Sequence, residues 1–248
     1  MLDWLTPGIQ SQVLDGLVVT LWLTAITSVA AIIVGYRAGL ALLGDNRLGH
    51  VVAATFVQIF RNVPALILVI FFGFAVPNVV PLDARQTLFF DNDVVDLVGS
   101  LTGVPIPYYA MAATFALTLN TGAHLAEIFR SGFSSVPQSR IDVARSLGAS
   151  HADALRSVVA PIGIRIAFPA VSNRLIHNLK NTSLASFLAV PELFQVVQSS
   201  ISRTFRATDI LVFAALLYLA LAFALSILLS LIGRLLGGVP GAVESAGV

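Results

Sequence analysis

The chain has 248 residues, of which 57% are hydrophobic and only 11% are charged, whereas a soluble domain of this length carries roughly a quarter charged residues because its surface faces water. This composition excludes an ordinary soluble protein and indicates an integral membrane protein of bacterial type. The formal net charge of +1 gives no sign of nucleic-acid binding, and the absence of cysteine excludes disulfides, zinc–thiolate sites and cysteine nucleophiles.

The first ten residues carry Asp3, Trp4 and Pro7 and lack the basic segment that begins a cleaved signal peptide. We therefore expect the whole chain to be mature protein, targeted by its own first membrane helix. A membrane-crossing helix needs about 20 apolar residues. Segments of this kind follow in order: 15–43, 51–76, 108–129, 158–180 and 210–236. The sequence thus predicts an all-α membrane protein with about five transmembrane helices in one domain, residues 1–248.

Two of the predicted spans contain residues that disturb helices. The second contains Pro64, and the fourth contains Pro161, Gly163 and Pro169. We expect breaks at these positions to expose backbone groups inside the membrane, as in transporters whose interrupted helices line a substrate cavity.

Basic residues near the span ends predict the orientation, because loops rich in arginine and lysine stay in the cytoplasm. One side of the membrane receives seven such residues: Arg37, Arg47, Arg130, Arg140, Arg145, Arg156 and Arg234. The other side receives three: Arg85, Arg203 and Arg206. We therefore expect the N-terminus outside, the C-terminus in the cytoplasm, residues 130–157 in the cytoplasm and the acidic segment 77–105 outside.

The chain shows no internal repeat with a period of 20 to 50 residues. It is therefore not expected to be an inverted-repeat transporter contained in one polypeptide. A small, odd number of spans instead suggests a subunit that completes its pathway by dimerising.

The cytoplasmic segment 130–161 predicts two short amphipathic helices joined by a glycine. Pro137 suits the first turn of a helix, where its missing N–H costs nothing. Apolar or small residues then recur at helical spacing: Ile141, Ala144, Leu147 and Gly148. Gly148 can end this helix in a left-handed conformation. Ser150 can cap the next helix, with Asp153 as its capping-box partner. Such an element suits docking into a groove of a partner protein.

Within this segment, Asp142-Val-Ala144 is followed after three residues by Gly148 and then by Val158-Val-Ala-Pro161. The pattern resembles the diagnostic loop of permease subunits of ATP-binding-cassette importers: Glu-Ala-Ala, three residues, Gly, nine residues, Ile-x-Leu-Pro. Asp142, Val143 and Ala160 depart from it. In that family the loop carries the coupling helices that insert into the ATPases. The resemblance implies an ATPase-coupling role for Arg140, Asp142, Ala144, Arg145, Leu147, Gly148 and Ala149.

Three further segments are similar to the branch of that family that carries polar amino acids, such as histidine, glutamine, glutamate and arginine. They are Phe60-Arg-Asn-Val-Pro-Ala-Leu66, the stretch 117–132, and Leu179-Lys-Asn-Thr-Ser-Leu-Ala-Ser186. Their order along residues 51–190 matches that of the family.

The resemblance implies a location and a set of partners. The location is a bacterial inner membrane, crossed several times and in contact with its lipid. The partners are two ATPase subunits that use ATP and Mg²⁺, a second permease and an extracytoplasmic amino-acid-binding protein. The chain itself is expected to bind no cofactor and to be no enzyme. A phosphate-binding loop needs Gly-x-x-x-x-Gly-Lys-Ser/Thr, and the single lysine, Lys180, lies between Leu179 and Asn181.

Polar side chains inside the predicted spans indicate a substrate path, because such residues are costly in a membrane and mark function by default. On the third span they recur at i, i+4 and i+7 and share one helix face, and the fourth span repeats this spacing. The candidate substrate-binding residues are Arg61, Asn62, Asn120, His124, Glu127, Asn173, Arg174, His177 and Lys180.

The same residues also fit a structural role, in which Glu127 pairs with Lys180 or Arg174 and ties helices together. Basic side chains outnumber Glu127, the only carboxylate that we assign to the interior of a span. This imbalance favours a glutamate- or glutamine-like cargo over a cationic amino acid. His124 and His177 lack a third ligand, so no metal site is expected.

Two other functional classes remain as alternatives. An intramembrane enzyme lacks its motifs, because no histidine precedes a glutamate and Gly132-Phe-Ser-Ser has no closing glycine. A carrier driven by a proton or sodium gradient is the stronger rival, since Glu, His and Lys inside spans can serve a proton relay. The sequence leaves open which amino acid is carried and whether the second permease is the same chain or a paralogue.

Overall fold

The computed structural model describes residues 4–104 and 106–236, and every regular element in this part of the chain is helical. The C-terminus that we expect in the cytoplasm lies outside the described residues. The helices are α1 (Pro7–Ala41), α2 (Arg47–Asn62), α3 (Ala65–Ile70), α4 (Val76–Val79), α5 (Leu82–Phe89), α6 (Asp93–Thr102), α7 (Pro107–Ser134), α8 (Gln138–Ser146), α9 (His151–Ala154), α10 (Ala160–Asn181), α11 (Leu193–Thr204) and α12 (Ala207–Leu235), with π-helical turns η1 (Phe71–Ala75) and η2 (Leu155–Val159) and the 3₁₀-helix η3 (Thr182–Leu188).

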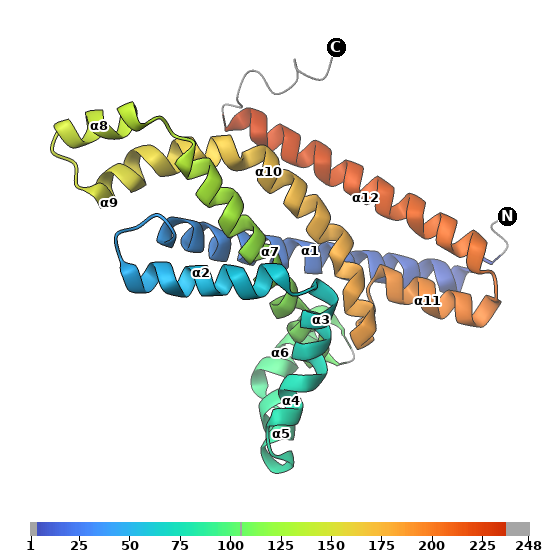
Figure 1. The fold of residues 1–248 in the computed structure, drawn as a ribbon. Coiled ribbons are helices and arrows are strands. Elements are labelled where there is room, and N and C mark those ends of the chain that lie inside the picture. The colour runs from blue at the N-terminus through green and yellow to red at the C-terminus, as the bar shows by residue number, and fades with distance from the viewer. Residues whose placement is uncertain (1–3, 105, 237–248) are drawn as a thin grey trace.

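The central helix of the bundle is α7, and α1 and α10 pack along it (Figure 1). Glycines let these backbones approach closely, as is common between membrane helices. A Cβ atom on Gly35 of α1 would lie 2.6 Å from Leu125 Cβ, and one on Gly132 of α7 would lie 2.7 Å from the Gly163 carbonyl oxygen of α10. The outer helix α12 instead exposes most of its apolar surface, as a lipid-facing helix does.

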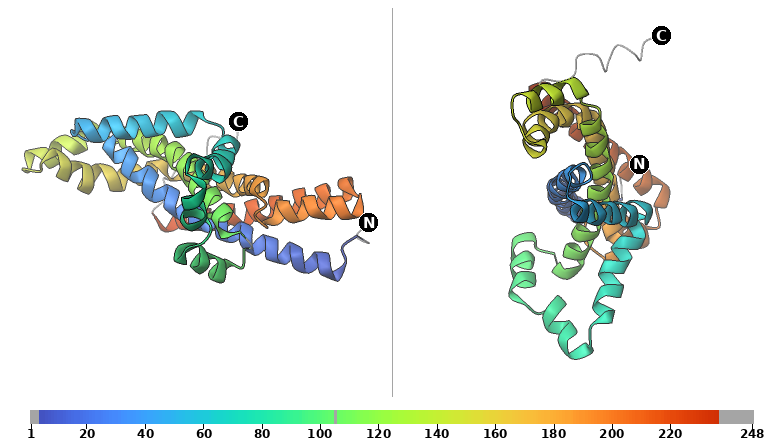
Figure 2. Two further views of the ribbon diagram at one scale, coloured as in Figure 1. Left: turned by 90° about the horizontal axis from the view of Figure 1, so that it is seen from below. Right: turned by 60° about the vertical axis from the view of Figure 1, so that its left-hand side comes forward.

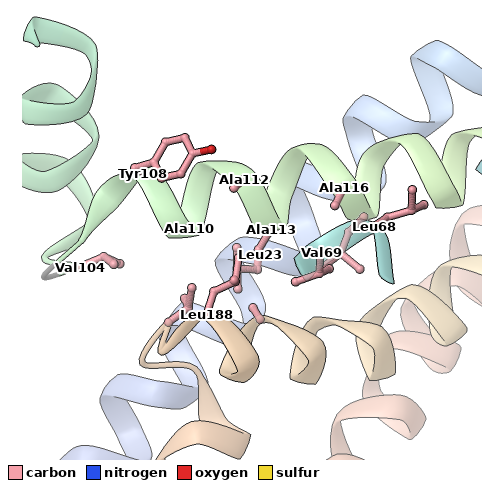
Figure 3. Close-up of a cluster of buried hydrophobic side chains, with 13 residues drawn as sticks. Leu23, Leu68, Val69, Val104, Tyr108, Ala110, Ala112, Ala113, Ala116 and Leu188 are labelled. Carbon is pink, nitrogen blue, oxygen red and sulfur yellow. The ribbon is translucent and has the colours of Figure 1, made fainter. Parts of the chain in front are cut away.

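A second part of the core forms where α1, α3, α7 and η3 meet (Figure 3). Leu23 of α1, Val69 of α3 and Leu188 of η3 are almost completely buried against the small residues of α7. The segment from α3 to α6 leads away from the bundle and returns to α7 (Figure 2). The acidic segment 77–105, which we expect outside the membrane, thus contains the short helices α4, α5 and α6, apart from Pro105, which is not described.

Three helical stretches of the described chain are long and apolar enough to cross a membrane: Pro7–Ala41, His151–Leu188 and Ala207–Leu235. They overlap the first, fourth and fifth predicted spans. A bent pair, Arg47–Asn62 and Ala65–Val79, supplies a fourth if it is one span. The predicted third span is an unbroken helix, α7. Its composition is less apolar than that of the three stretches above, because other helices of the bundle surround it. The count of five transmembrane helices stays a prediction.

The second predicted span is broken at Pro64, as expected from its sequence. Its two halves meet at a 103° bend between Asn62 and Ala65. Pro64 causes the break, since a residue before proline avoids the helical conformation, and Val63 is extended with φ −85° and ψ 130°. Arg61 and Asn62, expected inside a span, therefore end α2 at an exposed corner.

The fourth predicted span, by contrast, is not interrupted. Helix α10 runs through Pro169 without a break, and Pro161 and Gly163 lie in its first turn. Membrane helices tolerate proline where neighbouring groups compensate for the lost hydrogen bond. The expected separate second helix of the segment 130–161 is also wrong, because α9 continues through η2 into α10 as part of one stretch of 38 residues, His151–Leu188.

The turn between α1 and α2 lies beside α9, where His151 Nε2 is 3.8 Å from Asp45 Oδ1. Helices α8 and α9 and this turn occupy the end of the bundle opposite the N-terminal end of α1 (Figure 1). Arg156, one of the basic residues that we assign to the cytoplasm, lines a groove together with Asp45 and Asn46 of this turn. The orientation itself stays a prediction.

Replacing Gly163 with alanine is expected to destabilise the helix bundle. The new Cβ would lie 2.5 Å from Phe133 Cδ1 and 2.9 Å from Phe133 Cα, and a backbone atom of a packed helix cannot move aside cheaply. Overpacking of this kind costs about 1–3 kcal/mol, which a lower thermal midpoint in detergent would report. Gly8→Ala is the matched control, because its Cβ meets no atom within 4 Å. Equal midpoints for the two variants would contradict the expectation.

Candidate functional site

An open groove with a volume of about 480 Å³ lies where the break after α2 meets α7 and α10. Six of the nine substrate-binding candidates lie on its wall. The lining residues are Arg61, Asn62, Val63, Pro64, Ala65, Leu66, Asn120, His124, Arg174, His177, Asn181 and Leu184. The structure therefore brings together residues that are more than a hundred positions apart in the sequence.

The break after α2 explains why α7 carries an asparagine here. A helix end leaves carbonyl groups without intrahelical donors. The Asn120 side chain, only 3% exposed, donates from Nδ2 to the Phe60 carbonyl oxygen at 2.9 Å. Its other atom, Oδ1, accepts a hydrogen bond of 2.7 Å from Arg174 Nη2 on α10. Asn120 thus links three helices and fixes the position of the Arg174 guanidinium.

Arg174 retains unused hydrogen-bonding capacity. Its Nε is buried and has no hydrogen-bond partner, and its Nη1 lies 3.4 Å from His177 Nδ1. The described ion pairs do not include Arg174, and no aspartate or glutamate lines the groove beside it. A buried donor without an acceptor, and a buried charge without a counter-charge, are both unfavourable. An anionic ligand in the groove would satisfy both.

The remaining polar groups of the groove are also suited to an anion. Arg61 contributes a second guanidinium. His124 Nδ1 donates to the Asn120 backbone carbonyl at 2.9 Å, since that oxygen can only accept, and its Nε2 is left for another partner. The lining residues include no aspartate or glutamate. The groove can therefore hold a carboxylate, with amide groups of Asn62 and Asn181 for a further polar group.

Three candidates lie outside the groove. Glu127 forms an ion pair with Arg130 one turn later on α7, with a distance of 2.6 Å between Arg130 Nη2 and Glu127 Oε1. The alternative in which it pairs with Lys180 or Arg174 is therefore wrong, because its carboxylate pairs with Arg130, three residues later on the same helix. Asn173 and Lys180 are exposed and are not among the residues that line the groove.

Asn178 is a buried polar residue for which the sequence assigned no role. It is completely buried, donates from Nδ2 to Thr27 Oγ1 at 2.7 Å, and accepts at Oδ1 from Thr121 at 2.8 Å. It thus joins α1, α7 and α10 immediately beside the groove. Its i+4 relation to Arg174 places it one turn further along α10, and no local signal distinguishes it from the exposed Asn173.

Glu192 was missed because it lies between the fourth and fifth predicted spans. Its side chain is completely buried and caps α11, accepting from Phe194 N at 2.9 Å and Gln195 N at 2.7 Å. The Tyr218 hydroxyl of α12 donates to it at 3.0 Å. A glutamate directly before a helical segment is a weak sequence signal, since helix N-caps are usually Ser, Thr, Asp or Asn.

Stability is expected to depend on pH through Glu192. Burial raises the pKa of this carboxyl group from 4.5 to about 7, against the lowering effect of its hydrogen bonds. The folded state therefore holds the proton more tightly than the unfolded state. This contribution is fully present below the unfolded value and is lost as the pH rises through about 7.

The thermal midpoint in detergent should accordingly fall between pH 6 and pH 8.5. Glu192→Gln, which cannot ionise, should flatten this part of the curve, whereas Asp209→Asn on α12 should retain it. A pH dependence that persists unchanged in Glu192→Gln would rule out this carboxyl as its origin.

The segment 130–161 follows its sequence prediction at two positions. Gly148 is left-handed with φ +89°, and Ala149 N donates to Ala144 O at 3.1 Å, which closes α8 in the expected way. Ser150 and Asp153 form the expected capping box. Pro137 is the N-cap of α8 rather than part of its first turn.

The side chains of α8 are open to a partner. None of its residues is buried, and Val143 and Leu147 expose 60% and 84% of their surface. The coupling candidates fall into two groups by exposure. Exposed are Arg140, Asp142, Arg145, Leu147 and Gly148, and partly buried are Ala144 and Ala149. Their ATPase-coupling role stays a prediction.

Comparison with known proteins places the chain among transport proteins. Residues 28–237 match the family described as "Binding-protein-dependent transport system inner membrane component". The nopaline transport system permease protein NocM of Agrobacterium fabrum is 31% identical over 206 residues, 82% of this chain and 79% of that protein. The glutamine transport system permease protein GlnP of Escherichia coli is 28% identical over 221 residues, 88% of this chain and 90% of that protein.

A solved structure described as "Crystal structure of an amino acid ABC transporter with histidines" is similar in fold. Its TM-score to this chain is 0.70 at 26% identity, with 91% of this chain and 94% of that chain covered. The family match covers most of the chain, and the apolar helices agree with it. The chain therefore belongs to the family of binding-protein-dependent transport system inner membrane components, as a multi-pass permease subunit of amino acid ABC transporters.

Proposed function

We propose that the chain is the translocating subunit of an ATP-driven importer of polar amino acids, with a glutamate- or glutamine-like cargo favoured. An extracytoplasmic binding protein delivers the amino acid to a pair of permeases, either two copies of this chain or this chain and a paralogue. Two ATPase subunits bind and hydrolyse ATP with Mg²⁺. Their closure is passed through the segment 130–161 to the bundle, which then opens alternately to the two sides.

The unsatisfied guanidinium of Arg174 in the groove carries this proposal. Every amino acid has a carboxylate, and an arginine held by a buried asparagine recognises that group in a defined orientation. Arg61 gives the groove a second cation, and its lining has no carboxylate to repel an acidic side chain. These features favour an acidic or neutral amino acid over a basic one.

The exposed surface of α8 supports the coupling role. Val143 and Leu147 present apolar side chains, and Arg140 and Arg145 lie on the same short helix. A helix with an apolar stripe among charged residues suits a groove on a partner protein. The similarity to permeases described as transporting glutamine and nopaline supports a polar cargo.

Uptake by the purified complex in proteoliposomes tests the proposal. Vesicles loaded with ATP and Mg²⁺, supplied with the binding protein and clamped with ionophores so that no ion gradient exists, should accumulate labelled L-glutamine or L-glutamate. Uptake should stop without ATP. Accumulation that follows an imposed proton or sodium gradient without ATP would instead establish the carrier alternative.

A further inference from the structure

A second polar cavity, separate from the groove, lies between α1 and α11. Its volume is about 550 Å³, and it shares no lining residue with the groove. The N-terminal part of α1 and α11 are at the end of the bundle opposite α8 and α9 (Figure 1). The residues of its wall are Gln12, Asp15, Gly16, Val18, Val19, Gly103, Pro191, Gln195, Val196, Ser199 and Arg203.

The cavity carries opposite charges on its two helices. Asp15 belongs to α1 and Arg203 to α11, and the described ion pairs do not join them. Arg203 Nη1 instead donates to Gln12 Oε1 at 3.4 Å, one helical turn from Asp15 on the same wall. A carboxylate and a guanidinium that line one cavity without pairing match a ligand with an ammonium and an anionic group.

The polar groups follow the helix periodicity, so each wall contributes polar side chains from one face of its helix. Gln195, Ser199 and Arg203 recur at i, i+4 and i+8 on α11, and Gln12 and Asp15 are three residues apart on α1. Gln195 and Gln12 offer amide groups, which can donate and accept hydrogen bonds with an uncharged polar side chain.

The walls of the cavity are fixed in place by packing. Gly16 brings α1 against the start of α11, where an added Cβ would lie 2.9 Å from Val196 Cγ2. Leu193 N donates to Thr20 Oγ1 of α1 at 3.0 Å, and the buried Glu192 ties the same turn to Tyr218 of α12. These contacts fix the position of α1 relative to the start of α11. A preformed site loses less free energy on binding than one that must be ordered first.

We propose that this cavity is a second amino-acid site, in which Asp15 binds the α-ammonium group and Arg203 binds the α-carboxylate. The inference rests on the proposed function, because it makes the cargo itself the ligand. With α8 and α9 in the cytoplasm, the site lies on the outer side and receives the zwitterion before the groove does. The groove, whose lining has cations and no carboxylate, then binds the carboxylate of the amino acid.

A phosphatidylethanolamine headgroup has the same pairing of ammonium and anion. We commit to the free amino acid, because the amides of Gln12 and Gln195 match a polar side chain that a lipid headgroup lacks. The choice of lipid in the experiment separates these two sources.

Thiol labelling tests the site without relying on transport. The chain has no cysteine, so Ser199→Cys introduces its only thiol within the cavity wall. Ser202→Cys is the matched control on α11, because Ser202 is exposed and outside the lining. The intact complex is reconstituted in nanodiscs of phosphatidylglycerol and phosphatidylcholine, and maleimide labelling of this chain is followed on gels.

We expect 10 mM L-glutamine or L-glutamate to slow labelling of Ser199→Cys at least threefold and to leave Ser202→Cys unchanged. Glutarate, which lacks the ammonium group, should not protect. Adding Asp15→Asn or Arg203→Gln should abolish protection, whereas Asp91→Asn, an exposed carboxylate outside the cavity, should retain it.

Absence of protection by either amino acid would overturn the proposal, as would protection that survives both charge substitutions. Protection that appears only when phosphatidylethanolamine is present, without amino acid, would assign the cavity to lipid and overturn it too. Uptake in proteoliposomes without such protection leaves the importer function standing and removes this site. Protection without ATP-driven uptake would instead keep this site and remove the importer function, so the two failures are distinguishable.

Discussion

Replacing Gly148 with valine is expected to reduce amino-acid-stimulated ATP hydrolysis and uptake at least tenfold while the protein still inserts and extracts normally. Gly148 has φ +89°, and no atom lies within 4 Å of its would-be Cβ. The obstacle is therefore the backbone conformation and not a steric contact. A β-branched residue strongly disfavours positive φ. The turn would change, and with it the angle between α8 and the α9–α10 stretch.

Gly148→Asn is the matched control for this prediction. Asparagine adopts the left-handed region more readily than other non-glycine residues, so this variant should retain clearly more activity than Gly148→Val. Amounts in the membrane and elution of the purified complex would be measured in parallel. Coupled ATP hydrolysis at the wild-type rate in Gly148→Val would show that the angle set by this residue does not matter.

Arg174→Gln is expected to lower the rate of uptake by about ten- to a hundredfold. A hydrogen bond to a charged group contributes about 1.5–3 kcal/mol, and each 1.4 kcal/mol corresponds to about a tenfold change. Glutamine keeps a donor near Asn120 but removes the charge and the buried Nε, which has no partner in the protein. The loss should therefore fall on the substrate and not on the fold.

Arg165→Gln provides the control, because Arg165 is an exposed arginine on the same helix and outside the groove. It should transport at nearly the wild-type rate. Arg174→Lys should fall between wild type and Arg174→Gln, since lysine keeps the charge but not the planar geometry. Wild-type uptake in Arg174→Gln, with an unchanged thermal midpoint, would exclude this residue from the substrate path.

Local features of this chain were predictable from its sequence. The membrane character follows from composition, because 57% hydrophobic residues cannot be buried inside so small a protein. The left-handed Gly148 and the capping box of Ser150 with Asp153 depend only on residues next to them in the chain. The same holds for the break at Pro64, although not for its angle of 103°.

The choice among the polar candidates was not predictable in this way. Helical spacing puts Asn120, His124 and Glu127 on one side of α7, but it does not say what each of them meets. In the structure the first two line the groove, and Glu127 is paired with its neighbour Arg130. Pro169 shows that a local signal can also mislead. The sequence predicts a helix break there, but α10 continues through Pro169 because the packing around it overrides the local tendency to break.

The sequence by itself determined that the chain is a membrane protein and where the turn at Gly148 lies, since apolar content and a positive φ are local properties. Only the tertiary structure decided which polar residues share a site. Asn120 reaches Phe60 across 60 positions, and Asn178 reaches Thr27 across 151. The burial of Glu192 depends in the same way on Tyr218 and α1. These contacts arise from how whole helices pack, and no local spacing in the chain specifies that packing.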